Sequence, residues 1–227
     1  MSTPLTDSIN ALTTYANEVT GGSDTTLSDA VHTLASGYGG GTPKWKNFSG
    51  GNIQAIIGDG NSYINTGLTI TDNGIFSCKF KPNQTVQYEY VFGTNVSSNI
   101  ARKINLQRQA VSNNWLFTVT LMVGAVVEVT DTVVMFKGSI GTTNIVYDLP
   151  LLLFRGYHQG KMESQTSKIT FYGMNIVDEN NEYIHKFVPW KDENDVICVK
   201  NLVTGDIYYN AGTGTFGYID AEGVEHV

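Results

Sequence analysis

The side chains best suited to acid–base chemistry form two carboxylate clusters in the C-terminal half of the chain. These clusters are Asp178-Glu179 and Asp192-Glu193-Asn194-Asp195. Hydrolysis of a glycosidic bond needs an acid and a base that point into one groove, and two residues on one strand share a face only at alternate positions. Neither cluster forms such a run along a strand, and both have the composition of turns. We therefore interpret them as solvated turn carboxylates and predict that the protein is not an enzyme, with a glycan hydrolase as the alternative.

Metal and cofactor chemistry is not predicted either. The four histidines, at positions 32, 158, 185 and 226, show no metal-ligand spacing, and Cys78 and Cys198 lie far apart within strand-like runs. The Asp192–Asp195 carboxylates could offer oxygens to calcium, but they lack the ligand pattern of a dedicated loop. Residues 212–217 match G-x-G-x-x-G, yet no helix follows, as a dinucleotide site requires. The sequence predicts no metal and no cofactor.

Sugar binding is the remaining chemistry for which residues can be named. Lectin-type sites combine an aromatic ring that stacks on a sugar with polar groups on a concave surface. The candidates for such a site are Trp190 and the group Arg155, Tyr157 and His158. Ordinary packing or surface decoration is the alternative for each of them.

Composition and charge narrow the class of protein. Fourteen Lys and Arg against twenty-one Asp and Glu give a net charge of -7, so the attraction that underlies nucleic-acid binding is missing and no nucleic-acid partner is predicted. The most apolar windows, Leu121–Val127 and Leu149–Phe154, are far shorter than the ~20 residues of a membrane helix. The first residues lack a basic region followed by an apolar one, so we expect no secretory signal and folding in a cytoplasm. The two cysteines are expected to be buried free thiols.

The elements that must position these residues are β-strands from Trp45 onward. Phe76, Cys78 and Phe80 alternate with polar residues, and about a dozen such runs recur between turn signals. Further strands are predicted at 86–92, 115–123, 126–130, 133–136, 144–147, 151–154 and 168–178. In the last of these the apolar parity slips at Gly173, which predicts a β-bulge. So many strands in residues 45–227 favour a mostly β domain of two packed antiparallel sheets.

A separate N-terminal module is predicted before this domain. Residues 1–36 show apolar residues at helical spacing in two runs separated by Gly21-Gly22, which predicts an αα-hairpin, and a Gly-rich linker follows at 37–44. The apolar stripe consists of Leu5, Ile9, Leu12, Ala16, Val19, Leu27, Val31 and Leu34. Two short helices bury little alone, so we expect the stripe to mediate self-assembly or docking on a larger assembly. Folding back onto the β domain is the alternative.

Three motifs, in order along the chain, carry a resemblance to a known family. Ser62–Gly67 resembles a "QYIDTG" opening, and Lys168–Asp178 resembles a "KIYYFKIYD" strand. The third match covers Phe187–Pro189, Asp195–Ile197, Leu202–Gly205 and Tyr209–Phe216, which is similar to a closing "NAGTGTF" segment. These motifs are typical of concanavalin A-like or laminin G-like jelly-roll domains of phage structural proteins and gut-bacterial surface proteins. Residues 5–31 separately resemble leader segments of phage tail and other virion proteins.

The resemblance implies both a fold and a setting. It implies a jelly-roll sandwich in a phage virion appendage, a tail or fibre protein whose lectin-like domain contacts a host-surface glycan. It also implies a homo-oligomer, such as a trimer, that joins other virion proteins through residues 1–36. A capsid head-fibre or decoration protein is the alternative. The chain departs from the motifs at Thr204, where relatives carry Asn, and at Asn65, where they carry Asp; a wider final turn or a Gly bulge is therefore expected at Thr204-Gly205.

Overall fold

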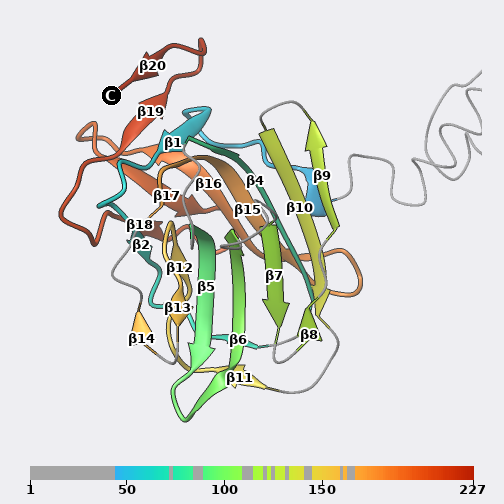
Figure 1. The fold of residues 1–227 in the computed structure, drawn as a ribbon. Helices are drawn as coiled ribbons and strands as arrows, with labels where there is room; N and C mark the ends of the chain where they lie inside the picture. Colours follow the sequence, from blue (N-terminus) through green and yellow to red (C-terminus); the bar gives the residue numbers. More distant parts are fainter. Residues whose placement is uncertain are drawn as a thin grey trace, which may run out of the picture. The chain divides into compact units, whose positions relative to one another are not determined.

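The computed structural model describes residues 44–71, 74–83, 89–108, 115–119, 122–123, 126–130, 133–140, 145–158, 161–162 and 167–227 (Figure 1). The chain divides into two units, residues 1–47 and 48–227. The predicted αα-hairpin, its apolar stripe and residues 37–43 of the linker lie outside the described residues. A short 3₁₀ helix at Lys44–Lys46 precedes the β domain. In the described part of the chain, no helix is long and apolar enough to cross a membrane.

Two main sheets make up the β domain, and every strand pair in them is antiparallel. Counted over the described residues, the larger sheet has ten strands. Its central part runs in the order β9 (Val126–Thr130), β10 (Val133–Ile140), β4 (Gly74–Pro82) and β15 (Ile169–Val177). Beyond β15 it continues in two branches, one with β16 (Tyr183–Lys191), β17 (Ile197–Asn201) and β18 (Ile207–Tyr208), the other with β1 (Ala55–Ile57), β19 (Gly217–Ile219) and β20 (Glu225–His226).

The smaller sheet contains six strands of the described chain. Their order is β2 (Ile64–Asn65), β12 (Leu152–Leu153), β5 (Tyr90–Val96), β6 (Asn99–Arg108), β7 (Trp115–Val119) and β8 (Met122–Val123). Two further ribbons, which pair with neither sheet, join β3 (Ile70–Thr71) to β11 (Val146–Tyr147) and β13 (Tyr157–His158) to β14 (Lys161–Met162). The expectation of a mostly β, antiparallel domain is confirmed, and the arrangement is consistent with a β-sandwich.

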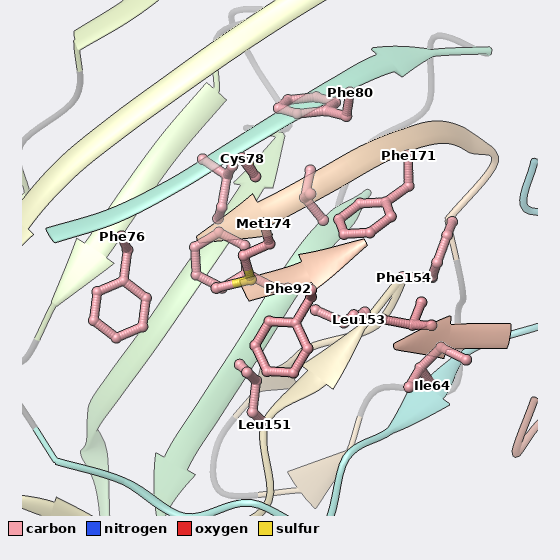
Figure 2. Packing of buried hydrophobic residues seen from close by; sticks show 14 of the residues in the cluster. Ile64, Phe76, Cys78, Phe80, Phe92, Leu151, Leu153, Phe154, Phe171 and Met174 are labelled. Atoms are coloured by element: carbon pink, nitrogen blue, oxygen red, sulfur yellow. The ribbon is translucent and has the colours of Figure 1, made fainter. Parts of the chain in front are cut away.

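The hydrophobic core gathers side chains from both sheets (Figure 2). Phe76, Cys78 and Phe80 of β4 point into it and are fully buried, as their alternation predicted. Phe92 of β5 faces them from the smaller sheet, with its ring centroid 6.2 Å from that of Phe76. Full burial of one such side chain stabilises the fold by about 2–3 kcal/mol. Both cysteines are free and buried, as expected.

The larger sheet branches at a bulge in β15. The register of β15 against β4 shifts between Phe171 and Gly173, and Gly173 has a φ of 145°, a value that L side chains rarely adopt. Before the bulge, β15 pairs with β1 through Thr170 and Phe171, and after it, with β16 from Met174 onward. The bulge predicted at Gly173 is therefore present, and it lies where β15 exchanges one partner strand for another.

The first and last motifs of the β domain are joined by one carboxylate. Oδ1 of Asp59 accepts hydrogen bonds from the N–H groups of Asn61 and Ser62 and from the Ser62 hydroxyl, each at 2.8 Å. Oδ2 of Asp59 accepts a hydrogen bond from the N–H of Thr215 at 2.9 Å. A Cβ atom at Gly214 would lie 2.0 Å from this Oδ2, so the close approach requires glycine. We call Asp59, Asn61, Ser62, Gly214 and Thr215 the Asp59 cluster.

Candidate functional site

An open hollow lies between the two branches of the larger sheet. Its volume is about 430 Å³, within the range of small-molecule sites. Three stretches form its walls: the turn before β17, the segment that precedes β19, and the end of β20. The lining residues are Asp195, Val196, Ile197, Asn210, Gly214, Thr215, Phe216, Tyr218, His226 and Val227. Figure 1 shows the two branches diverging from β15, with β17 in one and the β19–β20 hairpin in the other.

A stacked ring pair forms one wall of this hollow. The rings of Tyr218 and His226 are nearly parallel, with centroids 4.4 Å apart and an interplanar angle of 8°. Asp220 Oδ2 lies 2.8 Å from Nε2 of His226 and fixes the imidazole. The Asp220 turn itself is closed by N–H groups of Glu222 and Val224 that donate to Oδ1 of Asp220. The pair therefore presents a rigid, planar surface at the hollow.

Charged groups lie at the edge of the hollow and beside it. The ammonium group of Lys191 lies 2.8 Å from the carboxylate of Asp195 and 5.2 Å from the ring centroid of Tyr218. The hydrogen bond to Asp195 raises the pKa of Lys191 above its ordinary value, so this lysine is a cation at neutral pH. The hydrogen bond with His226 lowers the pKa of Asp220. Together with the apolar side chains of Val196 and Phe216, these groups give a mixed surface of the kind that sugar sites use.

Trp190, the first predicted ligand residue, lies on β16 and not in the hollow. Its backbone pairs with Cys198 of β17, and the ammonium group of Lys200 lies over its ring at 4.2 Å from the centroid. The indole is half-buried. A sugar that stacked on this face would have to displace the lysine.

The second predicted group, Arg155, Tyr157 and His158, does not line the hollow either, and its described side chains make separate contacts. Tyr157 is 4% exposed, and its hydroxyl donates to the carbonyl of Pro150 at 3.1 Å. Burial raises the pKa of Tyr157 to about 12. The guanidinium of Arg155 lies 4.5 Å from the ring centroid of Tyr63. The side chain of His158 lies outside the described residues, although its backbone pairs with Lys161.

The carboxylate clusters that opened the sequence analysis close their own turns. Oδ1 of Asp192 accepts hydrogen bonds from the N–H groups of Asn194 and Val196, and Oδ1 of Asp178 accepts from those of Asn180 and Glu182. The bond from Val196 is the main cause of the lowered pKa of Asp192. Over the described residues, no three His, Cys, Asp or Glu side chains are placed to share a metal ion.

Sequence reasoning assigned no binding role to the residues that line the hollow, although seven of them belong to the third family-like motif, within Asp195–Ile197 and Tyr209–Phe216. Its walls come from parts of the chain that are brought together only by the branching of the sheet. The remaining wall had a local signal of its own, because Asp220 and Gly223 have the composition of a hairpin turn between the short runs that form β19 and β20.

Comparisons with known proteins add no relative: no family, no curated protein and no solved structure matches this chain.

Proposed function

We propose that this chain is a structural, non-catalytic component of a phage particle whose β domain binds a host-surface glycan in the hollow between the sheet branches. The observation that carries the binding part is the hollow itself. It combines a planar ring pair, apolar side chains and polar groups in a volume of about 430 Å³, enough for a sugar unit. The virion part rests on the resemblance of the three motifs and of residues 5–31.

The finer fold that we propose is a concanavalin A-like jelly roll. Two of the family-like motifs meet in the Asp59 cluster, where Ser62 and Thr215 bind the same carboxylate. The closing segment is further tied to the first motif by the N–H of Ala211, which donates to the carbonyl of Tyr63 at 2.8 Å. These contacts give the closing segment a structural role in joining the two motifs.

A glycan array tests the binding part with two matched variants of the full chain. Val196 lines the hollow and is 46% exposed, whereas Val203 is 47% exposed and lies in the turn at the other end of β17. We expect Val196→Arg to fill the hollow and abolish binding, while Val203→Arg leaves it intact, because both changes add the same charge at equal exposure. A blank array, or equal binding by both variants, would contradict the proposal.

The virion part has its own tests. We propose that residues 1–36 assemble the chain, as a trimer or another homo-oligomer, and attach it to other virion proteins. Light scattering on the full chain should give a multiple of the monomer mass, and a charge placed in the apolar stripe, as in Leu12→Asp, should reduce it. Mass spectrometry of purified particles should detect the chain, and its absence would remove this part of the proposal.

A further inference from the structure

The ionisable side chains at the hollow between the sheet branches are bound to other groups of the chain. Among the described residues that line it, these side chains are those of Asp195 and His226. The carboxylate of Asp195 lies 2.8 Å from the ammonium group of Lys191, and Nε2 of His226 lies 2.8 Å from Oδ2 of Asp220. Each ionisable side chain that lines the hollow therefore already has a polar partner.

Lys191 is held in place through both its backbone and its side chain. The side-chain amide of Asn52 donates from Nδ2 to the carbonyl of Lys191 at 2.7 Å and accepts the N–H of Lys191 on Oδ1 at 2.8 Å. The ammonium group of Lys191 lies against Asp195 and over the ring of Tyr218. A sugar carboxylate that bound to this lysine would have to displace Asp195.

Carboxylates outnumber cations at the two turns that flank the hollow. The turn between β16 and β17 carries three carboxylates, and the turn between β19 and β20 carries two. They belong to Asp192, Glu193, Asp195, Asp220 and Glu222. Two groups that can carry a positive charge, Lys191 and His226, are bound to them. Because like charges repel over a Debye length of ~8 Å at physiological ionic strength, a further negative charge in the hollow is disfavoured.

A cationic sugar would meet carboxylates that are already occupied. Asp192 accepts the hydroxyl of Tyr209 on Oδ2 at 2.9 Å and two N–H groups of its own turn on Oδ1. Asp220 likewise divides its oxygens between N–H groups of its turn and the imidazole beside it. An ammonium group on a sugar would have to compete with Lys191 for the carboxylate that lines the hollow.

We propose that the hollow takes an uncharged sugar unit and that Asp195 sets this selectivity by holding Lys191. This inference rests on the proposed glycan function and adds the ligand class to it. An uncharged ring can lie against the side chains of Val196, Phe216 and Tyr218 without disturbing either ionic contact. An acidic or a basic sugar would have to break one of them.

The test compares sugars that differ only in charge. A glycan array carries trisaccharides that end in glucose, galactose or mannose, each beside its matching hexuronic acid and 2-amino sugar. Asp195→Asn frees Lys191 and keeps a residue type that tolerates the φ of 63° at this position. Glu179→Gln, in the turn at the other end of β16, removes the same charge away from the hollow. Binding that Val196→Arg abolishes is assigned to the hollow.

We expect the wild type to bind the neutral member of a series roughly 10-fold more tightly than its acidic or basic counterpart. In Asp195→Asn the preference over the hexuronic acid should fall to about 2-fold or less, whereas Glu179→Gln should keep the wild-type preference. Equal or tighter binding of a charged sugar in the hollow of the wild type, or an unchanged preference in Asp195→Asn, would overturn this inference and leave the glycan function standing. Absence of any binding that Val196→Arg abolishes would contradict the glycan function and this inference together.

Discussion

Removal of the Asp59 carboxylate should destabilise the β domain more than removal of any ordinary turn carboxylate. Asp59→Ala deletes all four hydrogen bonds of the Asp59 cluster, three from Asn61 and Ser62 within one turn and one from Thr215 in the closing segment. The bond from Thr215 matters most, because it joins segments at opposite ends of the domain sequence. Its loss should loosen the contact between the first motif and the last.

The magnitude follows from the number and kind of these bonds. A hydrogen bond to a charged group contributes about 1.5–3 kcal/mol, but the donors in the exposed part of the turn can bind water instead. We therefore expect the free energy of unfolding to fall by about 2–4 kcal/mol rather than by the sum of four bonds. For a domain of this size, that loss lowers Tm by roughly 5–15 °C.

Thermal unfolding of the full chain, followed by circular dichroism, measures this effect. Asp178→Ala is the matched control, because Asp178 accepts two N–H groups in a single turn and is joined by them to no distant segment. It should cost less than about 1 kcal/mol. Equal destabilisation by the two variants would refute the role of the Asp59 cluster.

The difference in Tm between the wild type and Asp59→Ala should also depend on pH. Burial acts to raise the pKa of Asp59, but hydrogen bonds from the N–H groups of Asn61, Thr215 and Ser62 and from the Ser62 hydroxyl outweigh it and lower the pKa below its ordinary value of 3.8. A lowered pKa contributes stability that is complete above the unfolded value and is lost as pH falls through the folded one. The Tm difference between wild type and Asp59→Ala should thus be constant down to about pH 5 and shrink below pH ~4. A difference that persists unchanged in acid would contradict the contribution of the ionised carboxylate.

Three further predictions concern other positions of the β domain. Gly214→Ala places Cβ 2.0 Å from Oδ2 of Asp59, so it should lower Tm about as much as Asp59→Ala and add little in the double variant; additive losses in a double-mutant cycle would contradict the shared contact. Burial raises the pKa of Cys78 well above its usual range and that of Cys198 to about 11, so iodoacetamide should label neither thiol in the native protein at neutral pH and both in urea; rapid native labelling would contradict their burial. Tyr157→Phe should cost about 1 kcal/mol of stability through its lost hydrogen bond. Because burial raises the pKa of Tyr157 to about 12, its contribution is complete below pH ~10 and lost toward pH ~12, a loss that alkaline melts should show in the wild type and not in the variant.

Local patterns predicted the strands and one of their irregularities. Alternation placed Phe76, Cys78 and Phe80 in the core, and the parity slip at Gly173 marked the bulge at which the sheet branches. The expected wide turn at Thr204-Gly205 is also present, since four residues separate Asn201 from Asp206 and Gly205 has a φ of 83°. These features depend on the period and chemistry of neighbouring residues, which the sequence displays directly.

Other features depend on contacts that no local pattern encodes. The run predicted as one strand at 115–123 is two strands, β7 and β8, that pair with each other, because an apolar run does not reveal where the chain reverses. The sequence does not distinguish a surface tyrosine from a buried one at position 157. In the structure, the hydroxyl of Tyr157 donates a hydrogen bond to the carbonyl of Pro150, a contact that no local pattern encodes. Phe154 has a φ of 65°, which its packing against Phe171 and Phe216 supports and which no sequence rule anticipates.

The central claim of a glycan site in the hollow is tested most directly by NMR. The isotopically labelled full chain is titrated with the glycan that binds most tightly on the array, and the chemical shifts of the backbone amides are followed. The account predicts saturable shifts centred on Val196, Thr215, Tyr218 and His226, which line the hollow. Absence of saturable shifts, or shifts centred on Trp190 or on the β13–β14 ribbon, would contradict it.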